Sequence, residues 1–512
     1  MSRSKHRKLA NRKRRIEHRL REIRWRDQPE PMYRASNVHY ELSDRLRGLD
    51  TGGIGAMHRL ARHTRLIEEI DGRLDLLKKH LPYHESDHVL GIAYNILCGG
   101  TCLQDIELRR NNEVFLDAMG AQRIPDPTTA GDFCRRFSAE DIESLMTAIN
   151  ETRLRVWARQ PAAFFREAMI DADGTLVETT GECKEGMDIS YNGIWGYHPL
   201  VVSLAQTGEP LYLVNRSGNR PSHEGASERL DQAAALCRRA GFRRITLRGD
   251  TDFTQTRHLD RWNEQRIRFV FGCDARENLI ERAEGLSRED WTRLVRKDRH
   301  PVRPERMRRH RDNVKDVKVI EHEFEHLRLR SEDVAEFAYR PTACERTYRV
   351  VVARKNITRE QGGLRLFDEI RYLFYITNDR KTSAAEIVLL ANGRCNQENL
   401  VEQLKNGVQA TRMPVDNLLS NWAYMLMASL AWTLKAWFAL LLPEGGRWAA
   451  AHAREKLAVL RMDFRTFLNA FVRVPVLVVR TGRRVVFRLL SWNPWQHVFL
   501  RSVDQFAGQL RC

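Results

Sequence analysis

The sequence predicts an α/β fold: a mixed sheet flanked by helices, with an all-α region before it and a β-rich insertion within it. Three observations support this prediction. Apolar residues recur with helical period over residues 57–157, strand-like runs alternate with helices over residues 168–271, and further strand-like runs lie between residues 317 and 377. A meander of three strands followed by alternating helix and strand is typical of a mixed sheet with helices on its faces.

The charge of the chain indicates its class of partner. Lys plus Arg total 85 against 67 Asp plus Glu, so the net charge is +18 and the pI is about 9.7. Such an excess favours polyanions, with nucleic acid ahead of an acidic membrane, and the alternative is a soluble basic protein without such a partner. Residues 1–27 form a basic arm, which we expect to become helical on a phosphate backbone or, alternatively, to be a solvated tail.

Residues 28–165 are predicted to be a helical DNA-binding region that begins with a linker. The Gly52-Gly53 pair indicates the end of that linker. Ser86 is expected to cap a helix that stops at Gly99-Gly100, and a proline-rich break is expected to cap another helix over residues 130–137. Short capped helices suit a helix-turn-helix-like module, and they equally suit a plain helical bundle.

Residues 166–274 are predicted to form the first part of the α/β core. The expected elements are, in order, three strands, a helix, a strand, a helix and a strand: 168–177, 198–205, 210–215, 227–240, 244–248, 254–265 and 267–271. The second and third strands are close enough along the chain to form a hairpin. Asp171 and Asp173 lie two residues apart on the first strand, so they share one of its faces.

Residues 275–375 interrupt this rhythm and predict a β-rich insertion with a basic approach. Nine Lys or Arg residues fall between Arg293 and Arg311, and strand-like runs follow at 317–324, 348–354 and 370–377. The second part of the core is expected over residues 376–442, and a basic C-terminal region over residues 443–512. Within the former, residues 418–442 are long and apolar enough to mimic a membrane span, but polar residues including Lys435 favour a buried core helix.

Three carboxylates are candidates for a shared site. Asp173 and Asp250 each end or follow a predicted strand, and Glu398 lies on a predicted helix. Two strand ends and a neighbouring helix can aim side chains at one point, where three carboxylates would repel one another unless a cation lay between them. Hard divalent metals are held in this way for phosphoryl transfer. Asp171 is the alternative to Asp173, and Asp252 is the alternative to Asp250.

The helix that carries Glu398 also presents a charged stripe. Arg394, Glu398, Glu402 and Lys405 recur at spacings of four, four and three residues, which places them on one helix face. An exposed row of ion pairs is the usual interpretation of such spacing. The strongly apolar flanking sequence instead indicates that this helix belongs to a core.

Together these segments resemble bacterial insertion-sequence transposases of the DDE superfamily, in particular the thirteen-eighty family of the insertion-sequence-four-like group. The third-carboxylate signature of that group is Tyr, two residues, Arg, three residues, Glu, six residues, Lys. Arg394, Glu398 and Lys405 fit this spacing, and Ala391 stands at the Tyr position. The first- and second-aspartate motifs fit Asp173-Gly174-Thr175 and Arg248-Gly249-Asp250. The resemblance covers about residues 85–440 and implies a ribonuclease-H-like catalytic core with a β-rich insertion before the third carboxylate.

The resemblance implies an enzyme that cuts and joins the ends of an insertion sequence by two-metal phosphoryl transfer. Two Mg²⁺ ions, for which Mn²⁺ could substitute, would lie about 3.5–4 Å apart. Asp173 would bridge both ions, and Asp250 and Glu398 would each hold one. Arg394 and Lys405 would contact DNA phosphates. Two alternatives stay open: a metal-dependent DNA nuclease that does not join strands, and a non-catalytic DNA-binding protein.

The implied partners are double-stranded DNA, both the terminal inverted repeats of the element and its target, and a second copy of the chain in a DNA-bound homodimer, with no membrane. The expected location is the bacterial cytoplasm, at the nucleoid. The Lys/Arg-rich N-terminus has no apolar run behind it, so no signal peptide is expected. The nine cysteines are scattered without a CxxC pair, as is typical of core thiols in a reducing compartment.

Overall fold

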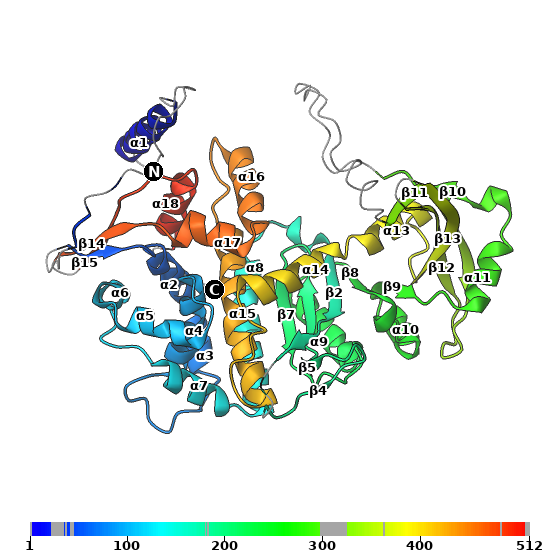
Figure 1. The fold of residues 1–512 in the computed structure, drawn as a ribbon, viewed down its shortest axis with the longest axis horizontal. Coiled ribbons are helices and arrows are strands. Elements are labelled where there is room, and N and C mark those ends of the chain that lie inside the picture. Colours follow the sequence, from blue (N-terminus) through cyan, green and yellow to red (C-terminus); the bar gives the residue numbers. More distant parts are fainter. Residues whose placement is uncertain are drawn as a thin grey trace.

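A computed structural model describes residues 3–21, 35, 38–40, 46–179, 181, 184–296, 325–361, 364–481 and 484–506. Figure 1 shows the N-terminal and C-terminal helices together at one end of the molecule and the long strands β11, β12 and β13 at the other. The core sheet lies between them. This arrangement confirms the predicted α/β fold, with a large mixed sheet flanked by helices.

The N-terminal region is helical, as predicted. Its helices are α2 (Ile54–His63), α3 (Leu66–Asp71), α4 (Glu85–Leu97), α5 (Glu107–Arg110), α6 (Glu113–Met119), α7 (Pro127–Arg135) and α8 (Ala139–Trp157). The predicted helix after the proline-rich break starts earlier than expected, because Asp126 caps α7 by accepting a hydrogen bond from the backbone N–H of Thr129. Pro127 then occupies the first helical position, where its missing N–H costs nothing.

The predicted cap of α4 is wrong by two residues. His84 is the N-cap, and its backbone N–H donates to the Asp87 carboxylate at 2.9 Å. Ser86 already lies inside the helix, where its N–H and hydroxyl both donate to Asp71 at 2.9 Å. The serine therefore ties α4 to the end of α3 instead of capping its own helix.

Nine strands form the main sheet, in the order β10-β11-β12-β13-β9-β8-β2-β6-β7. Five of them make the core: β2 (Ala168–Gly174), β6 (Leu200–Leu204), β7 (Glu209–Val214), β8 (Ile245–Gly249) and β9 (Arg268–Cys273). β2 runs parallel to β8, and β8 runs parallel to β9. β6 is antiparallel to both of its neighbours, β2 and β7. α9 (Ala226–Ala240) and α10 (Leu259–Glu264) connect these strands. Every residue of β6 and β8 is buried, as expected for strands covered on both faces.

The strands of the insertion extend the same sheet. They are β10 (Thr292–Arg293), β11 (Glu325–Tyr339), β12 (Tyr348–Gln361) and β13 (Leu364–Thr377), and β13 pairs with β9. The two predicted strands after residue 348 are real but longer, while the predicted strand at 317–324 and most of the basic run lie outside the described residues. β11 was not predicted because its charged residues hide the strand pattern; across the ladder they form ion pairs such as Asp333 with Arg354.

The long apolar helix α15 (Leu418–Leu440) is the centre of the fold. By length and composition it is the one helix among the described residues that could cross a membrane, but the structure buries it completely. It packs against α4, α7, α8 and β7, which agrees with the predicted core helix. Burial lowers the pKa of Lys435 to about 7, and the lysine Nζ donates to the Leu460 carbonyl at 2.6 Å.

The two ends of the chain meet. The basic arm is a helix, α1 (Arg3–Arg21), and Arg12 donates to the Ser491 carbonyl at 3.2 Å. Residues 48–49, predicted to be linker, instead form β1 (Gly48–Leu49), which pairs with β14 (Val476–Thr481) and through it with β15 (Arg484–Leu489). The remaining C-terminal helices are α16 (Ala449–Leu460), α17 (Phe464–Phe467) and α18 (Gln496–Gln505).

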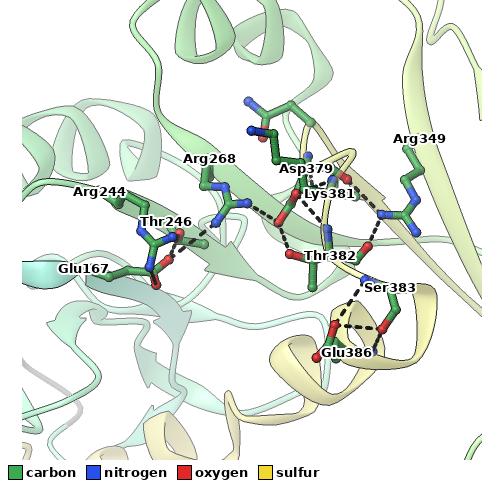
Figure 2. Close-up of polar contacts among 12 residues, drawn as sticks. Glu167, Arg244, Thr246, Arg268, Arg349, Asp379, Lys381, Thr382, Ser383 and Glu386 are labelled. Atoms are coloured by element: carbon green, nitrogen blue, oxygen red, sulfur yellow. Dashed lines mark hydrogen bonds and ion pairs between the residues drawn. The ribbon is translucent and has the colours of Figure 1, made fainter.

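A polar junction holds the start of α13 (Ala384–Asn392), the helix that leads to Glu398. Figure 2 shows the Asp379 carboxylate accepting hydrogen bonds from Arg268 of β9, from Lys381 and from Thr382. Arg349 of β12 donates to the Asp379 and Thr382 carbonyls, at 2.9 and 2.6 Å. The junction therefore fixes α13 to the edge where the core strands and the insertion strands meet.

We expect Asp379→Asn to lower the free energy of unfolding at neutral pH by about 1–3 kcal/mol, because it removes a buried charged acceptor from three partly buried hydrogen bonds. Burial acts to raise the pKa of Asp379, but its hydrogen bonds from Thr382 and Lys381 and the charge of Arg268 lower it overall. A lowered carboxyl pKa gives stability that is present above the unfolded-state pKa, about 3.9, and is lost as the pH falls through the folded-state pKa.

Urea unfolding of both proteins from pH 7 to pH 3 measures this effect. The difference between wild type and Asp379→Asn should shrink as the pH falls below about 4. A difference that stays constant across this range would show that the carboxylate charge does not stabilise the junction. Asp274→Asn is the matched control, because Asp274 is 62% exposed and its ion pair, 3.9 Å from Arg276, is on the surface.

Candidate active site

Asp173 and Asp250 lie side by side at the ends of two adjacent parallel strands. In the β2–β8 ladder Ala168 is opposite Ile245 and Asp171 is opposite Arg248. Continuing that register by two residues places Asp173 opposite Asp250, just beyond the end of β8. Because parallel strands end at the same edge of a sheet, the backbone alone brings the two carboxylates to one level.

Arg394 joins these two carboxylates. Its Nη1 lies 3.2 Å from Asp173 Oδ2, and its Nη2 lies 3.3 Å from Asp250 Oδ2. All three side chains are partly buried, between 17% and 33% exposed. The two aspartates that the sequence singled out therefore share one site, and the arginine expected to contact DNA lies between them.

Glu398 is brought to the same edge by the residue before it. On α14 (Cys395–Glu402), Gln397 is buried and its Nε2 donates to the Val201 carbonyl of β6 at 3.0 Å. Val201 is the register partner of Asp173 in the β2–β6 ladder. This anchor docks the first turn of α14 against β6, the neighbour of the strand that carries Asp173, close enough for the Glu398 charge to act on Asp173.

Asp171, the alternative to Asp173, is fully buried and is paired with an arginine. Both its carboxylate oxygens accept hydrogen bonds from Arg248, each at 2.7 Å. Arg248 also donates to the Leu390 carbonyl of α13 at 2.7 Å, so it ties β2, β8 and α13 together. The backbone at Gly393, just after α13, passes so close to the Arg248 side chain that a Cβ on Gly393 would lie 2.8 Å from Arg248 Nη1.

Asp252, the alternative to Asp250, is exposed in the turn Thr251–Phe253. Its backbone N–H donates to the Asp250 side chain at 3.1 Å, which helps to orient that carboxylate. The positioning roles of Arg248 and Gln397 were not predicted from the sequence. A buried arginine in a strand and a glutamine beside an apolar helix face were the available signals, and both are weak without the pairing register.

Lys405 reaches the same site from a wider turn of helix. It lies in the π-helical turn Gln403–Gly407 after α14, and its Nζ donates to the Leu176 carbonyl, just beyond β2, at 2.8 Å. Burial lowers the pKa of Lys405, while the charges of Glu402 and Asp173 act to raise it. The predicted stripe is not a row of surface ion pairs, since Arg394 and Lys405 both turn toward the strand ends.

The electrostatics of the site favour binding a cation. Burial raises the pKa of Asp173 to about 6, the charges of Asp250 and Glu398 add to this, and the guanidinium of Arg394 opposes it. Burial likewise raises the pKa of Asp250. Three acidic groups thus lie together beside Arg394 and Lys405, and a bound divalent cation would relieve the repulsion among the carboxylates.

The donor set fits a hard divalent metal. Its ligand atoms are carboxylate oxygens, which Mg²⁺ and Mn²⁺ prefer. The Nη1 atom of Arg394 is buried and makes no hydrogen bond of good geometry, so its ion pair with Asp173 is a contact that a metal could replace. Beside Asp250, Arg394 and Glu398 a cavity of about 360 Å³ opens between the core strands and β13.

A family model described as "Transposase DDE domain group 1" matches residues 50–509. The chain belongs to this family. It is a DDE transposase, an enzyme that cleaves and joins DNA strands, and enzymes of this family use divalent metal ions. The prediction of a DDE transposase is thereby confirmed.

No curated protein matches the sequence. Among solved structures, the transposase is similar to "Cryo-EM structure of piggyBac transposase synaptic complex with hairpin DNA", with 9% sequence identity, a TM-score of 0.36, and coverage of 82% of this chain and 81% of that chain.

We expect Lys405→Ala and Arg394→Ala to slow strand cleavage by about 10- to 100-fold with little change in melting temperature. A charge-assisted hydrogen bond to a phosphate contributes about 1.5–3 kcal/mol, which corresponds to that factor. A cleavage assay paired with a melting curve measures both quantities. Arg412→Ala, an exposed arginine a few residues beyond Lys405, is the matched control. Normal cleavage with a lowered melting temperature would assign Arg394 and Lys405 to fold stability.

Proposed function

We propose that this transposase cuts and joins the ends of a bacterial insertion sequence by two-metal phosphoryl transfer, as a member of the thirteen-eighty family of the insertion-sequence-four-like group. The observation that supports it best is the meeting of Asp173, Asp250 and Arg394 at the strand ends. Gln397 docks Glu398 beside them. The Arg394, Glu398 and Lys405 spacing of that group supports the finer assignment.

In this proposal Asp173, Asp250 and Glu398 are the metal ligands and catalytic residues. Two Mg²⁺ ions bound there, or Mn²⁺ in their place, supply the activation of the attacking oxygen and the stabilisation of the leaving oxygen. Arg394 leaves the aspartates as they become ligands and turns its guanidinium to a DNA phosphate, for which its planar fork is suited. Lys405 holds a second phosphate, and the Asp171–Arg248 pair keeps β2 and β8 in register beneath the reacting centre.

The proposed partners are double-stranded DNA at the terminal inverted repeats and at the target, and a second copy of the transposase when DNA is bound. The helix α1 carries a dense row of basic residues, of which the described lysines and arginines other than Arg12 are exposed, and it is suited to bind a phosphate backbone. Together with the helices after residue 54 it would hold the ends of the element. The proposed location is the bacterial cytoplasm, at the nucleoid.

The direct test is incubation of the full chain with labelled DNA of the ends of its own element, with and without Mg²⁺. We expect cuts at the element ends only when Mg²⁺ or Mn²⁺ is present, and joined products when a target plasmid is added. Ca²⁺ is the control cation, because it binds oxygen ligands with a looser geometry. Cuts at the ends without any joined product would support a nuclease instead, and cuts without a divalent metal would contradict the metal mechanism.

A further inference from the structure

A second cluster of possible metal ligands lies far from the carboxylates in sequence, at the start of α4. It consists of His80, His84 and Glu85, whose ligand atoms all lie within 4.8 Å of one another. His80 comes from the loop between α3 and α4, His84 caps α4, and Glu85 is its first residue. The loop folds back on the helix, so three residues from two elements meet.

Glu85 is the centre of the cluster. It is 1% exposed, and its Oε1 accepts hydrogen bonds from the backbone N–H groups of Leu76 and Leu77, at 3.1 and 3.0 Å. Its Oε2 faces His80 Nε2 at 3.1 Å. Within the described part of the chain this carboxylate has no lysine or arginine within ion-pair distance, and His80 is the side chain that faces its second oxygen. The backbone N–H groups hold one oxygen, and the other faces an exposed imidazole, which leaves it accessible to a metal ion.

The two histidines are arranged as a pair. Their ring centroids lie 4.6 Å apart and the planes are inclined by 11°, so the rings stack. Both histidines are exposed, whereas Glu85 is buried and its carboxylate accepts hydrogen bonds from two backbone N–H groups. Orientation of a carboxylate ligand by hydrogen bonds of this kind is characteristic of built metal sites.

We propose that His80, His84 and Glu85 bind a divalent transition metal, with Zn²⁺ as the best match. Two imidazoles and one carboxylate are a ligand set that Zn²⁺ uses with a water molecule in the fourth position. Imidazole nitrogen favours Zn²⁺, Ni²⁺ and Co²⁺ over Mg²⁺, whereas the carboxylates at the strand ends offer oxygen alone. The two sites would therefore select different metals.

The bound metal would fix the loop to the helical region. The base of the loop is already closed by Asp71, which accepts hydrogen bonds from Ser86. The loop carries Lys78 and Lys79 beside a cavity of about 1000 Å³, and Arg136 lines the same cavity. A metal at His80 would hold this basic surface in place. Metal binding at these three residues is independent of the proposed DNA substrate and is measured without DNA.

The test is titration of the full chain with Co²⁺, followed by displacement with Zn²⁺. Four-coordinate Co²⁺ with imidazole ligands absorbs strongly in the visible range, whereas six-coordinate Co²⁺ in an oxygen site absorbs weakly. We expect one equivalent of the strongly absorbing species, lost on adding Zn²⁺. His80→Ala and His84→Ala should lose the absorption and bind Zn²⁺ at least about 10- to 100-fold more weakly, since loss of even an outer partner of a metal ligand has that effect.

Two controls make the result decisive. His6→Ala removes an exposed histidine of α1 and should leave the absorption unchanged. Melting curves with and without Zn²⁺ should show stabilisation of the wild type but not of His80→Ala. Absence of the strong absorption in the wild type, or its persistence in a His80→Ala/His84→Ala double variant, would overturn the proposal.

Discussion

Replacing Asp173, Asp250 or Glu398 with alanine is expected to abolish strand cleavage and to leave DNA binding intact. Each substitution removes a proposed metal ligand at a site where burial and like charges already favour a bound cation. Metal ions contribute several kcal/mol of transition-state stabilisation, so we expect a loss of about 10³-fold or more. The measurement is single-turnover cleavage of labelled end DNA beside a gel-shift titration of the same DNA.

The matched control is Asp252→Ala. Asp252 is exposed, lies two residues from Asp250 and has the same chemistry, and it is its backbone N–H that donates a hydrogen bond to the Asp250 carboxylate. It should retain cleavage within a few-fold. An inactive Asp252→Ala together with an active Asp250→Ala would show that the second ligand is Asp252, and loss of DNA binding in all three alanine variants would point to a structural role.

Replacing Glu209 with alanine is expected to destabilise the whole protein by about 3–5 kcal/mol, because it leaves a buried arginine without its partner. Glu209 begins β7, and its carboxylate accepts from Arg153 of α8 at 3.1 Å. It also accepts from the indole N–H of Trp157 at 2.9 Å and of Trp437 at 2.8 Å. Arg153 and Glu209 are 1% and 0% exposed. One carboxylate thus joins α8, β7 and α15.

Guanidinium chloride unfolding followed by tryptophan fluorescence measures this loss, since two of the indoles report directly on the network. Glu143→Ala is the matched control: Glu143 also pairs with an arginine, Arg229, but it is 41% exposed. A surface pair contributes about 0–1 kcal/mol. Equal effects of the two substitutions would show that burial of the Glu209 network does not contribute to stability.

The core of the fold was predictable because its strands are short, apolar and separated by turn residues or amphipathic helices. The edge of the sheet was not, since β11 carries charged residues whose partners on β12 are known only once the ladder is formed. The pairing of β1 with β14 was equally hidden, because two residues near the start of the chain pair with a strand more than 400 residues later. Local pattern does not encode such long-range pairing.

Some residues of the candidate site were likewise predictable from the sequence, and others were not. Asp173, Asp250 and Glu398 were identifiable because a strand end or a core helix carries each of them. Arg248 and Gln397, which position these carboxylates, were not identifiable, because their function depends on which backbone groups lie opposite them. Arg394 was expected to contact DNA, and the structure adds that its guanidinium lies between the two aspartates.

The most direct test of the three-carboxylate site is anomalous diffraction from crystals of the full chain with its end DNA and Mn²⁺. We predict two anomalous peaks about 3.5–4 Å apart, the spacing of two-metal sites. One should lie between Asp173 and Asp250 and the other between Asp173 and Glu398, with Arg394 turned away to a phosphate. A crystal without Mn²⁺ at these side chains, in which Arg394 still joins the two aspartates beside bound DNA, would contradict the proposed metal centre.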